Sequence, residues 1–286
     1  MIAITLKNLS FQVNHQPIFS QISYRFNPGL IHCILGQNGA GKSTLLKTLT
    51  QELTPSQGSI MWGHQPLHSL TPQSLARQRS VLAQSTELTF SFRVDQLIAL
   101  GAEVQQNALA MDAIIDAVLA VCELTSLRTR DYLTLSGGEQ KRVQIARVLA
   151  QIWPEDLSLD ALNTLAKQRQ NCRLQAVDSA PFKGRWLFLD EWTAGLDVKH
   201  QQQLAQYFRQ WTALGLSIVM VVHDIALAGL MADEVLMLKS GQIFASGAVA
   251  EVLTAKHLKL GLEMSSRVEI DAESGRPLIF PWFESF

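Results

Sequence analysis

The sequence has little charge imbalance, few cysteines and no hydrophobic run long enough to cross a membrane. Its 24 basic and 25 acidic side chains give a formal net charge of −1 over 286 residues, so no overall positive charge attracts it to nucleic acid or anionic lipid. The most apolar stretch, residues 211–222, is too short to span a bilayer. These absences argue against a nucleic-acid-binding protein and against an integral membrane protein.

The three cysteines are too few and too scattered for a disulfide framework. Cys33, Cys122 and Cys172 have no partner at metal-ligand spacing, and free thiols in a reducing compartment are the simplest interpretation. Residues 1–5 alternate as a strand does and carry no basic segment, so we expect no secretory signal. The sequence therefore indicates a cytosolic chain that reaches a membrane only through a partner.

What is present is a well-filled core of alternating strands and helices. Residues 31–35 form a short apolar run bounded by glycines, as expected for a buried parallel strand, and residues 42–53 space their leucines as a helix does. Two further apolar runs, 186–189 and 218–222, end in acidic or polar residues. This alternation predicts a largely parallel sheet with functional residues at the carboxyl ends of its strands.

The middle of the chain has the residue spacing of helices. Residues 111–123 place Ile114, Ile115, Val118, Leu119 and Cys122 on one helical face. We expect a mostly helical subdomain over about 86–150, inserted into a core with a β subdomain over about 1–85 and 186–264.

Two segments lie outside this core. A loop insertion over about 151–185 contains a predicted amphipathic helix with Leu159, Leu162, Leu165 and Ala166 on one face. The tail over about 265–286 is predicted to form a short strand pair.

Residues 36–44 read GQNGAGKST and fit the phosphate-loop pattern G-x-x-x-x-G-K-[ST]. The glycines let backbone N–H groups turn inward around phosphates, and the helix that follows adds the positive end of its dipole. Lys42 is expected at the β- and γ-phosphates of ATP, and Ser43 at Mg²⁺. A glycine turn that binds nothing is the alternative, which the complete and correctly flanked motif disfavours. The expected nucleotide-binding residues are Gly36, Gln37, Asn38, Gly39, Ala40, Gly41, Lys42, Ser43 and Thr44.

Polar residues end two of the later strands. Asp190 can hold Mg²⁺ through water and Glu191 can polarise the attacking water. Many strands end in charged turns, so it is the phosphate loop upstream that favours the catalytic interpretation. His223 ends another strand, where it can donate to a γ-phosphate oxygen, or be structural.

A second anion cradle follows the helical segment. Residues 135–140 read LSGGEQ at the start of a predicted helix, where Ser136, Gly137, Gly138 and Glu139 can surround an anion. One chain does not need two cradles for one triphosphate. We infer that this cradle serves the nucleotide held by another copy.

With these motifs in this order, the sequence resembles the ATP-binding-cassette (ABC) family over nearly its whole length. The resemblance implies an α/β fold, a P-loop NTPase cassette with a RecA-like core, an N-terminal antiparallel β subdomain and an inserted α-helical subdomain, all within a single domain over 1–286. It also implies a head-to-tail homodimer. Each ATP would lie between the phosphate loop of one subunit and the LSGGE sequence of the other.

The resemblance also implies roles for individual residues. Gln84 is the glutamine that senses Mg²⁺ and the γ-phosphate, Glu191 is the catalytic base and His223 is the switch histidine. The implied metal ligands are Ser43, Gln84 and Asp190, and Asp197 closes the segment known as the D-loop. The implied cofactors are ATP and Mg²⁺.

Three positions depart from the family pattern. Trp192 stands where proline usually follows the catalytic glutamate, and residues 194–197 read AGLD where SALD is common. The alignment also places Val13, which is not aromatic, at the position of the residue that stacks on adenine, with Phe11 two residues earlier. No residue that handles phosphate is missing.

Two features resemble particular importers. Phe90 and Phe92 are similar to an F-x-F-x-V pattern in ATPases that serve large permeases for iron chelates, haem and cobalamin, although ordinary packing explains them equally well. The long segment 151–185 and the tail 275–281 are similar to the ATPase subunits of bacterial haemin importers. For the segment itself, a tolerated surface insertion is favoured over a partner-binding role. His200 and His257 are expected to be solvated helix residues.

The sequence thus predicts an ATPase that powers an importer, with haemin as the favoured cargo. A siderophore or cobalamin importer is the nearest alternative, and a non-transport ABC ATPase acting on nucleic acid is further off. The implied partners are a second copy, a permease dimer in the membrane and, indirectly, a periplasmic or surface substrate-binding protein, with no nucleic acid. The implied location is peripheral, on the cytoplasmic face of the cell membrane.

Overall fold

The chain divides into two units. The computed structural model describes residues 2–84, 90–105, 108–154, 157–171 and 180–282. The first unit comprises Met1–Leu70 and Val219–Phe286, and the second comprises Thr71–Ile218. Among the described residues, every helix is too short or too polar to span a bilayer.

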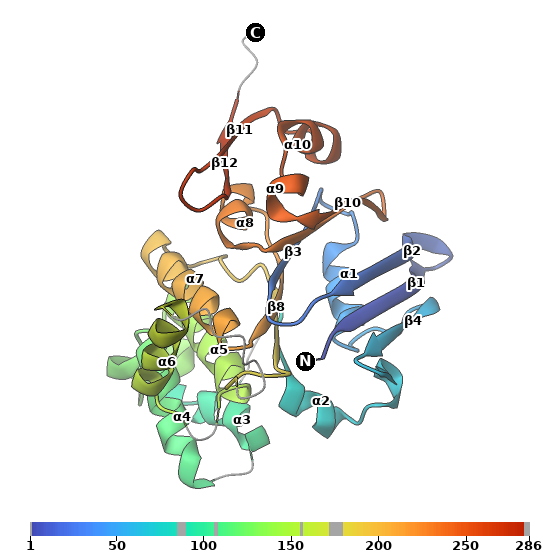
Figure 1. Ribbon diagram of the computed structural model, residues 1–286. Coiled ribbons are helices and arrows are strands. Elements are labelled where there is room, and N and C mark those ends of the chain that lie inside the picture. Colours follow the sequence, from blue (N-terminus) through green and yellow to red (C-terminus); the bar gives the residue numbers. More distant parts are fainter. Residues whose placement is uncertain (1, 85–89, 106–107, 155–156, 172–179, 283–286) are drawn as a thin grey trace. The chain divides into compact units, whose positions relative to one another are not determined.

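The first unit begins with an antiparallel sheet (Figure 1). Its strands lie in the order β2-β1-β4-β5 and comprise β1 (Ile4–Val13), β2 (Gln16–Phe26), β4 (Gln57–Trp62) and β5 (Gln65–Pro66). One face of the sheet is buried through residues such as Leu6, Phe19 and Ile60. The predicted N-terminal antiparallel β subdomain is therefore confirmed.

The same unit contains three strands of the core. β3 (Ile31–Gly36) pairs in parallel with β9 (Glu234–Lys239), and β10 (Gln242–Ala248) pairs antiparallel with β9. The first five residues of β3 are all buried, as a strand covered on both faces requires. α1 (Lys42–Leu49) follows β3 through the glycine-rich loop and ends before the predicted Leu53.

The C-terminal part of the first unit packs a hairpin on a helix. Three helices precede the hairpin: α8 (Ile225–Met231), α9 (Val249–Val252) and α10 (Ala255–Leu262). The hairpin consists of β11 (Ser266–Ile270) and β12 (Pro277–Pro281), which confirms the predicted strand pair. β12 lies against α8, since a Cβ on Gly229 would come within 2.7 Å of the Pro277 carbonyl oxygen.

The second unit contains two parallel strands and a group of helices (Figure 1). β6 (Arg79–Leu82) follows α2 (Pro72–Gln78) and pairs with β7 (Trp186–Asp190). β8 (Ser217–Val221) begins in this unit and ends in the first. The longer helices are α3 (Val94–Ala102), α4 (Ala108–Val121), α5 (Gly137–Gln151), α6 (Leu159–Asn171) and α7 (Val198–Ala213). Short 3₁₀ turns are η1 (Leu67–Ser69) in the first unit and η2 (Glu103–Gln105), η3 (Thr125–Leu127) and η4 (Tyr132–Thr134) in the second.

The apolar face predicted for α4 is confirmed. Ile114, Ile115, Val118 and Leu119 are all at most 4% exposed. Two buried thiols, Cys33 and Cys122, are free, and burial raises the pKa of the Cys122 thiol to about 12. Cys172 lies outside the described residues.

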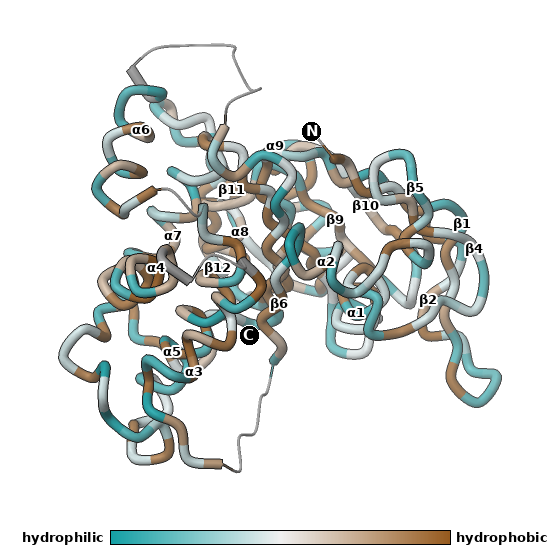
Figure 2. Tube along the Cα trace, turned by 90° about the horizontal axis from the view of Figure 1, so that it is seen from below, coloured by the Kyte–Doolittle hydropathy of each residue, from teal (hydrophilic) through white to brown (hydrophobic). Residues whose placement is uncertain are grey.

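The insertion contains the predicted helix, α6. Leu162 and Ala166 are buried, whereas the other two residues of the predicted face are partly exposed, and Figure 2 shows hydrophobic and hydrophilic residues alternating along it. Arg169 donates from Nη1 to the Ala213 carbonyl oxygen at 2.9 Å. Ala213 is the last residue of α7, where the negative end of the helix dipole also favours a cation. The insertion is therefore packed against α7.

An aromatic cluster fixes both ends of the insertion to α7. Trp153, before α6, contacts Trp211 edge-to-face with ring centroids 5.4 Å apart, and Phe182, after α6, lies 5.6 Å from the same ring. Phe208 continues the cluster to Trp192, 5.3 Å away. The residue that replaces the usual proline is thus part of a buried aromatic core.

Candidate functional site

The phosphate loop in the first unit is closed around its own lysine. Lys42 is 6% exposed, and its Nζ donates to the carbonyl oxygens of Gly36 at 2.8 Å and Gln37 at 2.9 Å. Gly39 and Gly41 have φ values of 78° and 93°, which favour glycine. The loop therefore holds an ammonium group against its own backbone carbonyls.

The loop leaves room for phosphate on one side. A Cβ on Gly36 would meet the Leu238 carbonyl oxygen at 2.5 Å, whereas a Cβ on Gly39 would have no heavy atom within 4 Å. Packing therefore requires glycine at position 36, whereas the space beside Gly39 is open. Backbone N–H groups, the N-terminus of α1 and a cation together fit a nucleotide's phosphate chain.

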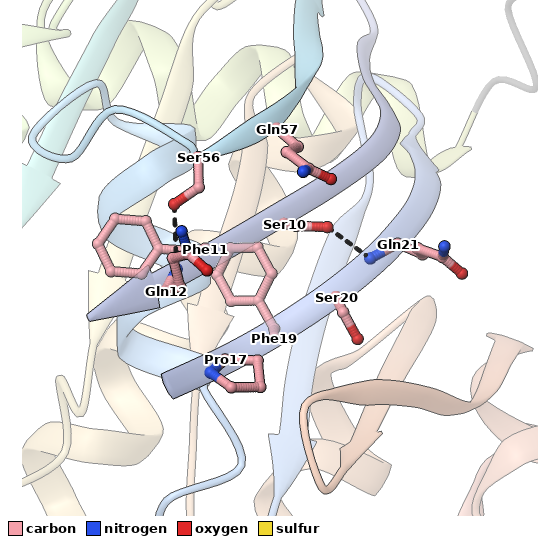
Figure 3. Close-up of a pocket in the computed structure, with 9 residues that line it drawn as sticks. All are labelled: Ser10, Phe11, Gln12, Pro17, Phe19, Ser20, Gln21, Ser56 and Gln57. Atoms are coloured by element: carbon pink, nitrogen blue, oxygen red, sulfur yellow. Dashed lines mark hydrogen bonds between the residues drawn. The ribbon is translucent and has the colours of Figure 1, made fainter. Parts of the chain in front are cut away.

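A cavity of about 400 Å³ lies beside the hairpin of β1 and β2 (Figure 3). Phe11 and Phe19 stack in it with ring centroids 6.0 Å apart. Val13, at the position of the usual adenine-stacking aromatic, is 48% exposed. Phe11 is thus engaged with another ring of its own unit. The cavity is lined by Ser10, Phe11, Gln12, Pro17, Phe19, Ser20, Gln21, Ser56 and Gln57.

The acidic pair lies in the second unit, at the carboxyl end of β7. Every residue of β7 is buried, and Asp190 is 3% exposed. Glu191 follows with a φ of 47°, a left-handed backbone that costs about 1–3 kcal/mol in a non-glycine residue. Gln84, just after β6, donates from Nε2 to Glu191 Oε2 at 3.0 Å. The structure therefore brings together three of the predicted catalytic and metal-binding residues.

Lys141 on α5 adds a cation near this pair. Burial lowers the pKa of Lys141, and the charges of Asp190 and Glu191 oppose that shift. No sequence pattern singled out this residue. Its position five residues after Ser136 on the same helix could have marked it, because it lies within two turns of the second cradle.

The second cradle begins α5 with a capping box. Ser136 donates from its backbone N and from Oγ to Glu139 Oε2, both at 2.8 Å, and Glu139 N donates to Ser136 Oγ at 3.4 Å. The bonds from Ser136 lower the pKa of the Glu139 carboxyl. Glu139, predicted to bind nucleotide, here caps its own helix.

The two glycines of this cradle are packed differently. A Cβ on Gly137 would meet nothing within 4 Å, whereas a Cβ on Gly138 would lie 2.9 Å from the Gly195 carbonyl oxygen. Gly195 belongs to the D-loop and has a φ of 80°. Gly195, which stands where the family commonly has alanine, thus places its carbonyl oxygen against the cradle of the same chain.

The remaining predicted residues lie at element ends. His223 is exposed after β8 in the first unit. Phe90 is 73% exposed and Phe92 is half-buried, while the five residues before Phe90 lie outside the described residues. Neither His200 nor His257 is fully solvated, contrary to the prediction, since both are partly buried at the first turn of a helix.

Magnesium needs oxygen ligands from more than the protein. Within the described ranges, no group of three or more His, Cys, Asp or Glu side chains is arranged to hold a metal. The Gln84 amide and the Asp190 carboxylate in the second unit, and separately the Ser43 hydroxyl in the first unit, carry oxygen atoms of the kind that Mg²⁺ prefers.

Comparison with known proteins gives consistent matches. The model of the ABC transporter family matches residues 19–154. The Hemin import ATP-binding protein HmuV of Rhodopseudomonas palustris (strain BisB5) is 32% identical over 279 residues, which cover 98% of this chain and 97% of that protein. HmuV of Rhizobium meliloti (strain 1021) is 34% identical over 279 residues, with coverage of 97% and 98%. The solved structure of an ATP binding subunit of an ABC transporter covers 90% of this chain and 94% of its own, with a TM-score of 0.71 and 19% identity, which shows a shared fold.

Proposed function

This chain belongs to the ABC transporter family, and on that premise we propose that it is the ATP-hydrolysing subunit of a haemin importer. The observation that carries the proposal is its identity of 32% and 34%, over nearly the full length, to two hemin import ATP-binding proteins. An intact phosphate loop, LSGGE sequence and acidic pair support the ATPase activity.

The phosphate loop binds the β- and γ-phosphates of ATP. Its N–H groups and the α1 N-terminus donate to the phosphate oxygens. The ammonium group of Lys42, which donates to the carbonyls of Gly36 and Gln37, donates to the phosphate oxygens when ATP binds. Ser43, Asp190 and Gln84 are the residues that would hold Mg²⁺. Mg²⁺ held there would neutralise charge that develops on the phosphates during transfer.

Hydrolysis is an in-line attack of water on the γ-phosphorus. Glu191 accepts the water proton, the bond between the γ-phosphorus and the bridging oxygen breaks, and ADP and phosphate are released. His223 donates to a γ-phosphate oxygen and orients the water. Gln84, which holds the Glu191 carboxylate at 3.0 Å, has to release it when the water binds.

The second cradle acts on the nucleotide of a second copy. Ser136, Gly137 and Gly138 lie at the N-terminus of the 15-residue α5, whose N–H groups and dipole favour an anion. Glu139, which caps that helix, completes the cradle. ATP binding at two such sites closes a head-to-tail homodimer, and hydrolysis reopens it.

The homodimer acts on a permease dimer in the membrane. We place the subunit peripherally on the cytoplasmic face of the cell membrane, with a periplasmic or surface binding protein delivering haemin from the other side. It has no nucleic-acid partner, in keeping with its net charge of −1.

Reconstitution with the cognate permease in proteoliposomes tests the proposal. Haemin-loaded binding protein should stimulate ATP hydrolysis and haemin entry, and the Glu191→Gln variant should show neither. Stimulation by a ferric siderophore or cobalamin, without stimulation by haemin, would reassign the cargo. Absence of hydrolysis in every case would contradict the proposed ATPase activity.

A further inference from the structure

His200 connects the D-loop to a neighbouring helix. It lies in the first turn of α7, and its side chain is 16% exposed. Asp197 Oδ1 accepts from the His200 backbone N at 2.9 Å and lies 2.7 Å from His200 Nδ1. Since a carboxylate only accepts, Nδ1 is the donor. Both bonds to His200 lower the pKa of the Asp197 carboxyl, so the carboxylate that ends the D-loop is fixed twice by one residue.

The other side of the imidazole faces α4. His200 Nε2 lies 3.4 Å from Glu123 Oε2, and Lys199 Nζ donates to the same oxygen at 2.8 Å. Glu123 follows the last turn of α4 with a φ of 50°. The bond from Lys199 is the main cause that lowers the pKa of Glu123, and its carboxylate is the group that both side chains face.

The end of α4 is also bound to the helix that carries the second cradle. Arg142 on α5 donates from Nη1 to the carbonyl oxygens of Cys122 at 2.9 Å and Glu123 at 2.8 Å. Glu123 is therefore contacted both by α7, which follows the D-loop, and by α5, which begins at the second cradle. The D-loop itself also lies against α5, because Gly138 packs against the Gly195 carbonyl.

We propose that His200 is a positioning residue whose bond to Asp197 holds the D-loop in place beside the LSGGE cradle, so that the two segments meet a second copy in a fixed arrangement. The inference rests on the proposed function, in which both segments act across the dimer. Gly195 at φ 80° gives the D-loop more conformational freedom than the usual alanine. The bond from Nδ1 of His200 to Asp197 limits that freedom, and the contact at Nε2 directs the ring toward α4.

Two amide variants separate the two sides of the ring. His200→Asn retains a donor near Nδ1 and loses the contact with Glu123, whereas His200→Gln retains a donor near Nε2 and loses the bond to Asp197. If the bond to Asp197 positions the D-loop, His200→Gln should lower kcat for ATP about tenfold, in line with the loss of one charge-assisted hydrogen bond, while KM for ATP changes less than twofold. His200→Asn should restore most of kcat.

Lys199→Met is the matched control, because Lys199 contacts Glu123 without contacting Asp197. It should leave kcat unchanged. Equal kcat in the Asn and Gln variants, or losses that follow the melting temperature in all three variants, would overturn the inference.

A second measurement does not depend on hydrolysis. Hydrogen exchange of the backbone amides over 196–201, without nucleotide, should accelerate in His200→Gln and His200→Ala and stay near the wild-type rate in His200→Asn. Unchanged exchange in His200→Ala would overturn the inference even if the wild type hydrolyses no ATP. Changed exchange in a chain that hydrolyses no ATP would instead overturn the proposed function alone.

Discussion

Gln84 donates a hydrogen bond from Nε2 to Oε2 of Glu191 at 3.0 Å, which joins the segment after β6 to the end of β7. Glu191 has a left-handed backbone with φ 47°, a conformation that persists where surrounding contacts hold it. The proposed catalytic base is thus restrained by the residue proposed to sense the metal and the γ-phosphate. Its release by Gln84 is a step that ATP binding can control.

Replacing the carboxylate of Glu191 by an amide tests its role as the base. Glu191→Gln should bind ATP and accumulate as an ATP-bound dimer, while kcat falls by about 10²–10⁴-fold because no group accepts the water proton. Nucleotide binding, size-exclusion chromatography and steady-state hydrolysis measure the three properties. Glu269→Gln on the exposed β11 is the control. Wild-type turnover by Glu191→Gln would refute the assignment.

The two cradle glycines should differ in their effect on stability. In Gly138→Ala the new Cβ would lie 2.9 Å from the Gly195 carbonyl oxygen, and displacing that backbone should cost about 1–3 kcal/mol. In Gly137→Ala the Cβ meets nothing within 4 Å, and helix propensity should raise stability by up to about 1 kcal/mol. Thermal unfolding of both variants measures this. Equal melting temperatures would contradict the packing of Gly138 on the D-loop.

Trp192 should be a strong determinant of stability. It is fully buried and packs edge-to-face on Phe208, so Trp192→Ala should reduce the free energy of unfolding by about 3–5 kcal/mol. Trp282, which is 64% exposed, offers a matched control whose change to alanine should cost within about 0.5 kcal/mol. Urea unfolding followed by circular dichroism compares them. Similar losses in both variants would show that the aromatic cluster does not stabilise the turn after β7.

Stability should fall in mild acid because of His32. This ring is buried, and burial lowers its pKa below the usual value of about 6.5, despite the carboxylate of Glu234 at 3.4 Å. Below about pH 6.5 the unfolded chain binds a proton that the folded ring does not, so the free energy of unfolding decreases as pH falls toward the folded pKa. Above that pH the effect vanishes.

The slope of unfolding free energy against pH isolates this residue. His32 should contribute up to about 1.4 kcal/mol per pH unit within that window. His32→Gln should flatten the dependence between pH 7.5 and pH 5.5, whereas replacement of the exposed His64 by glutamine should leave it unchanged. A slope that is the same in wild type and His32→Gln would contradict the buried neutral ring.

Local patterns were sufficient for much of the fold and for the phosphate chemistry. The face of α4, the phosphate loop and the C-terminal hairpin follow from spacing within a few residues, and the ABC fold is confirmed by the comparisons. The partial burial of His200 was not predicted, because Glu123 comes from the distant turn after α4. Only its bond to Asp197, three residues earlier, was visible as a possible helix cap. Lys141 was missed because its charge matters only where α5 approaches β7.

The central claim is that the cradle around Ser136 acts on the nucleotide bound by Lys42 of a second copy. A mixture of two inactive variants, Lys42→Met and Ser136→Arg, tests it most directly. In a head-to-tail dimer, each mixed pair has one site with both changes and one site with neither. The mixture should therefore hydrolyse ATP faster than the average of the two variants alone. A mixture no faster than that average, with Ser136→Arg alone retaining wild-type turnover, would contradict the shared site.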